Sequence, residues 1–305
     1  MRIPLLRSRR ERPPAPFVVG VGRSGTTLLR LMLDAHPELT IPPETGFLPD
    51  LIEAAKADGA TPESVLEAVT GHRKWGDFPM SEEELLERWR SLDRLRPRGA
   101  VRAFYELYAD HQGKPRWGDK TPGYTMHMGP IANTLPEARF VHVIRDGRAV
   151  ALSRMRTLAL RPKQISKVAR RWQKRLRKAR KKGRRLDHYI ELRYEELVRD
   201  PEPVLRQVCE FIELDWDPAL LDYHRRSEGR LAELDRDIPA WEGKLPRSAE
   251  SRMALHRQTT KPLDPARIDR WRTELSEQEI ETFEREAGEL LDELGYERAT
   301  ALPRS

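Results

Sequence analysis

The sequence has a single cysteine, few aromatic residues and no long hydrophobic run. One cysteine in 305 residues excludes an intrachain disulfide framework and any metal or iron–sulfur site built from several cysteines. No stretch approaches the ~18 apolar residues that a membrane-spanning helix needs, and the apolar run in the N-terminal MRIPLLRSRRERPPAP is too short for a signal peptide. We therefore expect a cytoplasmic protein without a transmembrane segment.

Charge is abundant but unevenly distributed. Lys and Arg outnumber Asp and Glu by 56 to 49, a net charge of +7, yet residues 161–185 alone hold 14 Lys and Arg and no acidic residue. The remainder has 42 basic and 49 acidic residues. The protein is thus a slightly acidic body with one basic segment, which favours a local anion-attracting face over a nucleic-acid coat. Ile165, Val168, Trp172 and Leu176 form one stripe and predict an amphipathic helix there.

Three interpretations of this basic helix stay open. It is a solvated charged face, a docking surface for an acidic peptide or glycan, or a surface attracted to membranes or nucleic acid. Aromatic residues that would stack on bases are absent from it, so no nucleic-acid partner is expected.

Strands and helices alternate along most of the chain. Residues 1–15 are rich in Arg and Pro without a period and predict a flexible basic arm, whereas 16–305 are expected to form a single domain. Apolar runs that predict strands occur at 17–20, 139–144 and 189–193, with helical patterns between them. This alternation predicts an α/β fold, a P-loop-like parallel sheet flanked by helices.

Two long segments and a terminal helix extend this core. Residues 50–112 are mainly helical in pattern and are expected to form a helical insertion. Residues 225–262 are polar, irregular and punctuated by prolines, which predicts a cofactor or acceptor loop. A C-terminal helix is expected to begin at a capping box at Ser276 and to end at Gly295.

A glycine-rich turn, GVGRSGTT, joins the first strand to its helix from Gly20 to Thr27. It matches the G-x-x-x-x-G frame of a phosphate-binding loop, in which backbone N–H groups and a helix N-terminus attract anions. In nucleotide triphosphatases a lysine follows the second glycine, but here Thr26 follows it, and Arg23 supplies a cation two residues before that glycine. The turn predicts an anion-binding loop without the lysine that reaches β- and γ-phosphates.

A second anion site is predicted after the strand at 139–144. Arg145 opens the run RDGRAVALS there, and the carboxyl ends of parallel strands meet at one edge of a sheet. Arg145 is therefore expected on the same edge as the glycine-rich turn. Its guanidinium suits a phosphate, and Ser153, a turn or two into the following helix, adds a hydroxyl.

These segments resemble the PAPS-dependent sulfotransferase family. FVVGVGRSGTTLL is similar to that family's 5′-phosphosulfate loop, and FVHVIRDGRAVALS to its 3′-phosphate strand and helix. WGDKTP at 117–122 and LRYEEL at 192–197 agree in order and spacing. RSGTTLLRLMLDAHPE, followed by PET at 43–45, is most similar to the tyrosylprotein sulfotransferase branch.

The resemblance implies a role for each motif residue. The donor, 3′-phosphoadenosine 5′-phosphosulfate (PAPS), and its product PAP would be bound by Arg23, Ser24, Gly25, Thr26 and Thr27 at the 5′ end, by Arg145 and Ser153 at the 3′-phosphate, by Tyr194 beside the nucleotide, and by Ser248 and Lys261 from a closing loop.

Catalysis would combine positive charge with a general base. Sulfuryl transfer needs the attacking oxygen, the sulfur and the leaving oxygen in line, with the developing charge stabilised. Arg23 and Lys120 would supply that charge, and no metal is expected, because no Asp, Glu or His cluster has metal-ligand spacing. Glu44 matches the general-base position of the tyrosylprotein branch. Full deprotonation of a phenol by a free glutamate costs roughly 8 kcal/mol, so Glu44 must accept the proton as the S–O bond forms, and burial that raises its pKa would help.

The expected activity is transfer of a sulfuryl group from PAPS to a hydroxyl acceptor, with release of PAP. Tyrosine, carbohydrate and small-molecule acceptors stay open, and an acidic peptide or glycan would dock on 161–185. Two other functions stay open as well. One is a P-loop kinase that uses ATP and Mg²⁺, against which Thr26 at the lysine position argues, and the other is a polyanion-binding module that acts through the basic helix.

Overall fold

The computed structural model describes residues 12–158, 164–243 and 245–299. Most of the expected basic arm lies outside these residues, as does the N-terminal part of the basic segment. The first strand, β1, begins at Ala15. Among the described residues no helix is both long and apolar enough to cross a bilayer.

A four-stranded parallel sheet forms the centre of the molecule, in the order β4-β1-β5-β6. Its strands are β1 (Ala15–Gly20), β4 (Asp119–Lys120), β5 (Ala138–Ile144) and β6 (Tyr189–Arg193). A separate parallel pair consists of β2 (Leu39–Thr40) and β3 (Arg116–Trp117). Gly20 pairs with Val143, and Ile144 pairs with Arg193. The loops that leave these strands therefore start from one edge of the sheet, as the sequence predicts for an α/β fold.

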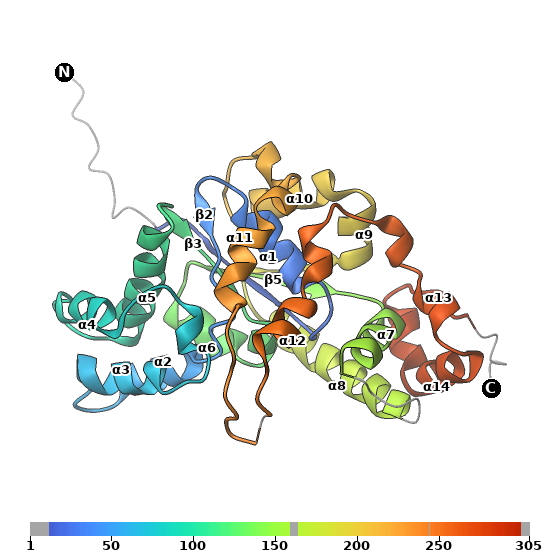
Figure 1. The fold of residues 1–305 in the computed structure, drawn as a ribbon, viewed down its shortest axis with the longest axis horizontal. Coiled ribbons are helices and arrows are strands. Elements are labelled where there is room, and N and C mark those ends of the chain that lie inside the picture. The colour runs from blue at the N-terminus through green and yellow to red at the C-terminus, as the bar shows by residue number, and fades with distance from the viewer. Residues whose placement is uncertain (1–11, 159–163, 244, 300–305) are drawn as a thin grey trace.

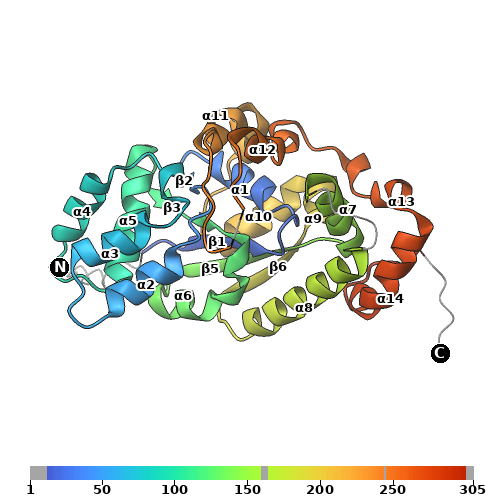
Figure 2. The same cartoon turned by 60° about the horizontal axis from the view of Figure 1, so that its bottom comes forward.

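Helices cover the sheet in three groups (Figures 1 and 2). The insertion and the region after it form α2 (Leu48–Lys56), α3 (Pro62–Thr70), α4 (Glu82–Arg90), α5 (Pro97–His111) and α6 (Met128–Thr134). The strands lead into α1 (Thr26–Asp34), α7 (Gly147–Leu158), α8 (Ile165–Gly183), α9 (Tyr194–Arg199) and α10 (Pro201–Phe211). The C-terminal part adds α11 (Ser227–Leu231), α12 (Ala249–Ala254), α13 (Trp271–Glu274) and α14 (Glu277–Glu293). The α2–α5 group and the α8–α14 pair lie at opposite ends of the long axis.

The core follows from the alternation of side chains along each strand. Phe17 and Val19 of β1 pack with the insertion helices, whereas Val18 packs with α1 and α10. A third cluster joins α7, α8 and α14, where the rings of Trp172 and Phe283 lie 5.7 Å apart. The predicted apolar stripe of α8 is buried in this cluster, and Ser276 caps α14 as expected.

Candidate active site

The glycine-rich turn forms an open cradle at the start of α1. Arg23 and Gly25 both have positive φ angles, of 80° and 99°, and Gly25 is the N-cap of the helix. The first N–H groups of a helix have no partner within it, so they are available to an anion. The hydroxyl of Ser24 is buried and has no hydrogen-bond partner in the described part of the chain. The turn therefore has the geometry of an anion-binding loop.

Tyr194 explains why position 25 is a glycine. A Cβ atom placed on Gly25 would lie 2.3 Å from Cδ2 of Tyr194, which is closer than atoms can approach. The Tyr194 ring also stacks under the guanidinium of Arg145 at 4.1 Å. β6 and β5 thus deliver an aromatic ring and a cation directly beside the loop that follows β1.

The two predicted anion sites are contiguous. Arg145 donates a hydrogen bond to the backbone carbonyl of Arg23 at 3.2 Å, and Arg23 Nε donates to Ser153 Oγ at 3.0 Å. The Nε of Arg145 is buried and has no hydrogen-bond partner among residues 12–158, 164–243 and 245–299. The loop, the arginine after β5 and the serine of α7 therefore border one contiguous region, which we call the cleft. Arg156, further along that helix, is exposed and paired with Glu274.

Glu44 and Lys120 form an ion pair beside the cradle. Lys120 Nζ lies 2.9 Å from Glu44 Oε1 and 3.4 Å from the hydroxyl of Thr27 in the glycine-rich turn. The Lys120 side chain is only 4% exposed, whereas that of Glu44 is 34% exposed. The arrangement places a buried ammonium group between the anion-binding loop and a carboxylate that solvent can reach.

The pKa of Glu44 is shifted in the direction opposite to the one that would strengthen a general base. Burial disfavours its charged form, but the ammonium groups of Lys120 and Lys74 outweigh burial and hold the pKa of Glu44 well below its usual range. Lys74 Nζ lies 2.6 Å from Glu44 Oε2. The raised pKa that would help a general base is therefore not found, because Lys74 as well as Lys120 contacts this carboxylate. Glu44 is ionised at neutral pH and can accept a proton.

A buried network of hydrogen bonds lies next to the ion pair of Glu44 and Lys120. Asp119 Oδ2 accepts hydrogen bonds from Thr45 at 3.0 Å and Tyr105 at 2.9 Å, and the Thr45 hydroxyl also contacts that of Tyr124 at 2.6 Å. Burial raises the pKa of Asp119 to about 6. Because Thr45 follows Glu44 and Asp119 precedes Lys120, the network fixes the backbone that carries the ion pair.

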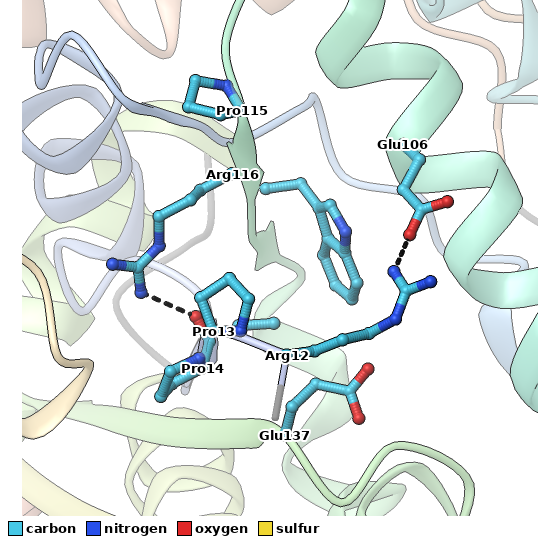
Figure 3. A pocket seen from close by; sticks show the side chains of 9 residues that line it. Arg12, Pro13, Pro14, Glu106, Pro115, Arg116 and Glu137 are labelled. Atoms are coloured by element: carbon cyan, nitrogen blue, oxygen red, sulfur yellow. Dashed lines mark hydrogen bonds and ion pairs between the residues drawn. The ribbon is translucent and has the colours of Figure 1, made fainter. Parts of the chain in front are cut away.

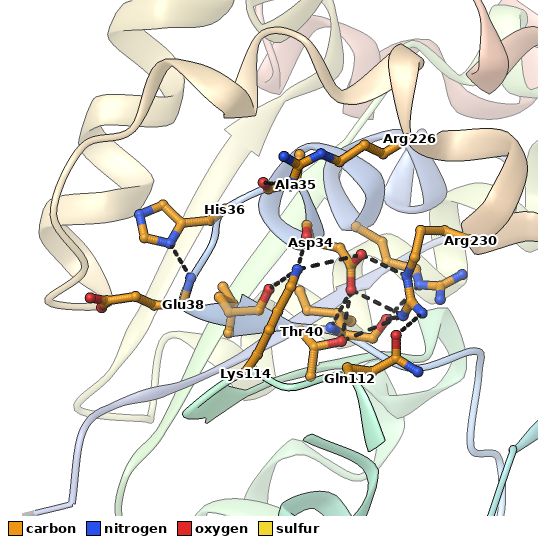
Figure 4. Close-up of polar contacts among 12 residues, drawn as sticks. Asp34, Ala35, His36, Glu38, Thr40, Gln112, Lys114, Arg226 and Arg230 are labelled. Carbon is orange, nitrogen blue, oxygen red and sulfur yellow. Dashed lines mark hydrogen bonds and ion pairs between the residues drawn. The ribbon is translucent and has the colours of Figure 1, made fainter. Parts of the chain in front are cut away.

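The described residues from α11 to Thr260 are anchored at two places on the rest of the molecule. On one side Arg230 of α11 donates to the Asp34 carboxylate at the end of α1, at 2.7 and 3.1 Å (Figure 4). On the other side Arg252 of α12 donates to the buried Asp77 at 2.6 Å. Between α12 and the end of the segment, the carbonyl of Leu255 accepts a hydrogen bond from Arg23 at 3.4 Å.

His256 is a site residue that sequence reasoning missed. Burial lowers its pKa to about 3, and the nearby charges of Lys120, Glu44 and Arg23 also act on it. It is therefore neutral at pH 7 and lies near the ion pair. Neither His256 nor Lys74 belongs to a recognisable motif, so only the folded chain brings them to the cleft.

Ser248 and Lys261 make their observed contacts within the C-terminal part. Ser248 caps α12 by accepting a hydrogen bond from the N–H of Ser251 at 3.2 Å. Lys261 is exposed, and its carbonyl accepts a hydrogen bond from the Tyr223 hydroxyl at 2.7 Å. Their expected contacts with the donor stay predictions.

A small pocket of about 80 Å³ lies at the start of β1, at the opposite end of that strand from the glycine-rich turn (Figure 3). Arg12 pairs there with Glu106, and Arg116 donates to the carbonyl of Pro14 at 2.9 Å. The pocket is thus separate from the cleft. No cluster of three or more His, Cys, Asp or Glu side chains suited to a metal ion occurs in the described portion of the chain.

Comparison with known proteins identifies the family. A family model described as "Sulfotransferase family" matches residues 14–218. The chain belongs to this sulfotransferase family. It is 28% identical over 219 residues to a protein-tyrosine sulfotransferase of Drosophila melanogaster, a match that covers 69% of this chain and 40% of the fly protein. It is also 28% identical over 326 residues to the nodulation protein NoeE of Sinorhizobium fredii, covering 95% of this chain and 68% of that protein.

Solved sulfotransferase domains share the fold. The domain from the curacin biosynthetic pathway superposes with a TM-score of 0.59 at 19% identity, covering 94% of this chain and 99% of that domain. The domain of the Synechococcus olefin synthase gives 0.53 at 24% identity, covering 91% and 96%. The expected α/β sulfotransferase fold is therefore confirmed. Several of the most similar relatives are longer proteins, since the chain spans about 40% of the fly enzyme and 53% of a Caenorhabditis elegans one.

Proposed function

We propose that this sulfotransferase-family protein transfers the sulfuryl group of PAPS to a hydroxyl acceptor and releases PAP. The observation that carries the proposal is the contact between the two anion sites, through Arg23, Arg145 and Ser153. A donor with a phosphosulfate at one end and a 3′-phosphate at the other needs two such sites in one cleft. ATP lacks a 3′-phosphate, and the loop has Thr26 where an ATP-using P-loop has its lysine.

The residues of the cleft fit the demands of the reaction. Arg23 and Lys120 supply positive charge where negative charge develops on the sulfuryl oxygens and the leaving phosphate. Burial lowers the pKa of Lys120, and the adjacent Glu44 opposes that effect and favours the ammonium form. The acceptor hydroxyl would give its proton to Glu44 while its oxygen attacks the sulfur. Because Glu44 is a weak base before the reaction, proton transfer must accompany S–O bond formation.

The acceptor and the location of the protein are part of the same proposal. One side of α8 is neutralised by α14, since Arg177 pairs with Glu293 at 2.7 Å and Arg170 with Glu286 at 3.7 Å. Exposed cations remain elsewhere on the helix, and we propose them as a docking surface for an acidic peptide or glycan. We also propose a cytoplasmic location, which the single, buried Cys209 supports. Incubation with ³⁵S-labelled PAPS and a cell extract would identify the acceptor.

PAP is expected to raise the melting temperature without Mg²⁺, and Arg145→Ala is expected to abolish that shift. Arg145 has a buried Nε without a partner and stacks on Tyr194, so its loss removes both the charge and the wall of the nucleotide site. Differential scanning fluorimetry with PAP measures this. Lys178→Gln, on the exposed face of α8, is the control and should shift as the wild type does. Stabilisation by ATP and Mg²⁺ but not by PAP would instead favour a kinase.

Gly25→Ala should weaken PAP binding by roughly tenfold or more, because a side chain at this left-handed position is strained and displaces Tyr194. Gly22→Ala is the matched control in the same loop, since its added Cβ would meet only Arg154, at an ordinary 3.8 Å. Isothermal titration calorimetry with PAP compares the two variants. Equal affinities would argue that the loop does not bind the donor.

A further inference from the structure

Glu44 is held by two ammonium groups, one on each carboxylate oxygen. Lys120 lies 2.9 Å from Oε1, and Lys74 lies 2.6 Å from Oε2. A carboxylate that makes two such charge-assisted hydrogen bonds is fixed in orientation and is a weak base. A general base must also contact the acceptor hydroxyl through one of its oxygens. One of the two lysine contacts must therefore be exchanged before Glu44 can accept the proton.

The two lysines are not equivalent. Lys120 belongs to β4 in the central sheet, and its side chain is 4% exposed. Lys74 lies in the turn between α3 and the 3₁₀ turn Trp75–Asp77, within the helical insertion, and its side chain is 24% exposed. Lys74 is therefore the more accessible of the two to solvent and to an incoming molecule. Of the two contacts, the one to Oε2 is the one that an acceptor can exchange.

The surroundings of Lys74 favour an anion. The pKa of its neighbour Arg73 is lowered, first by burial and then by the positive charge of Arg247. The acidic group that acts on Arg73, Asp77, is already bonded by Arg236 at 2.7 Å and Arg252 at 2.6 Å. These contacts therefore join four arginines and one aspartate beside Lys74, which leaves an excess of positive charge among them.

We infer that Lys74 restrains Glu44 through their ion pair. When an acceptor binds, an anionic group next to its reactive hydroxyl replaces Glu44 as the partner of Lys74, and Glu44 Oε2 becomes free to accept a proton. The inference rests on the proposed function and adds a substrate class to it: hydroxyl compounds with a neighbouring carboxylate, phosphate or sulfate. Lys74 is a positioning residue in this scheme, since it acts on the reaction through Glu44.

The exchange leads directly into a balanced transfer step. The ion pair between Lys74 and Glu44 is replaced by one between Lys74 and the acceptor anion. The acceptor oxygen then forms a bond to sulfur, the bond from sulfur to the phosphate oxygen of PAPS breaks, and the hydroxyl proton moves to Glu44 Oε2. The leaving electron pair stays on PAP, so no oxidant or other reactant is needed.

The titration of Glu44 tests the restraint, with the protein saturated by PAP. The groups that face Glu44 are Lys74 from the insertion, Lys120 from β4, Arg23 from the glycine-rich turn and His256 from the C-terminal segment. ¹³C NMR of protein labelled at the glutamate Cδ, assigned with Glu44→Gln, reports the titration midpoint. Lys74→Met should move the midpoint to higher pH because it removes a cation, whereas Lys74→Arg should leave it low. An unchanged midpoint in Lys74→Met would overturn the inference.

A pair of phenolic probes tests the exchange in the same samples. 2-Hydroxyphenylacetate carries the anion beside its hydroxyl, and 2-hydroxyphenylacetamide is its uncharged counterpart. In the wild type the carboxylate should bind about tenfold more tightly than the amide, as expected for one charge-assisted hydrogen bond, and should move the Glu44 midpoint upward. Lys74→Met should lose the preference and Lys74→Arg should keep it. Equal affinity of the wild type for both probes would refute the exchange.

The two proposals fail in different ways. If PAP does not stabilise the wild type, the proposed function fails. If PAP stabilises the protein but Lys74→Met leaves the titration midpoint of Glu44 unchanged, only the inference about Lys74 fails.

Discussion

Lys120→Met should lower kcat for sulfuryl transfer by about 10²–10³-fold while PAP still binds. The ammonium group of Lys120 lies between the hydroxyl of Thr27 and the carboxylate of Glu44, at 3.4 and 2.9 Å. It thus links the glycine-rich turn to the proposed base, whereas the observed side-chain contact of Lys74 is with Glu44. Single-turnover transfer from ³⁵S-labelled PAPS, with PAP affinity measured by calorimetry on the same protein, separates catalysis from binding.

The control for Lys120→Met is Lys56→Met, which removes an exposed lysine in the last turn of α2 and should keep the wild-type rate. A Lys120→Met protein that turns over at a rate within about threefold of the wild type would show that Arg23 alone supplies the charge. Loss of PAP binding in parallel with kcat would instead assign Lys120 to the donor site.

Arg148→Met should destabilise the fold by about 3–5 kcal/mol. Arg148 is 1% exposed and donates to Asp146 Oδ2 at 2.7 Å and to Glu284 Oε1 at 2.5 Å. Its guanidinium also stacks on Trp271 at 3.7 Å. Through these contacts Arg148 joins α7 to α13 and α14. Its substitution leaves two buried carboxylates without the cation that they share. Urea unfolding followed by tryptophan fluorescence should show a lower midpoint.

A surface pair gives the matched comparison for Arg148→Met. Arg177 bonds Glu293 between α8 and α14, but its side chain is 43% exposed. Arg177→Met should therefore change the free energy of unfolding by no more than about 1 kcal/mol. Similar losses for both variants would mean that burial does not set the cost of breaking these pairs.

The residues at the edge of the sheet could be predicted from the sequence, because each motif there directly follows the strand that positions it. The turn from Gly20 to Thr27 follows an apolar strand directly, and Arg145 follows another. Parallel pairing then requires the two to meet, and the structure shows Arg145 bonded to the carbonyl of Arg23. The helix ends at Ser81 and Ser276 were predictable for the same reason, since a capping box needs only residues three apart.

The remaining parts of the site depend on packing between distant segments. Lys74 reaches Glu44 from 30 residues away, and His256 approaches from the far end of the chain. Neither position has a spacing rule that would single it out. The direction of the Glu44 pKa shift could therefore not be predicted, because it depends on Lys74 as well as on Lys120.

The positive φ of Arg23 has a consequence for the thermodynamics of binding. A non-glycine residue in this conformation costs of order 1–3 kcal/mol, and here the bonds from Arg145 to the carbonyl of Arg23 and from Arg23 to Ser153 hold it without any ligand present. Folding thus already meets the conformational cost of this turn, so the proposed nucleotide donor would need little further reorganisation of the loop to bind.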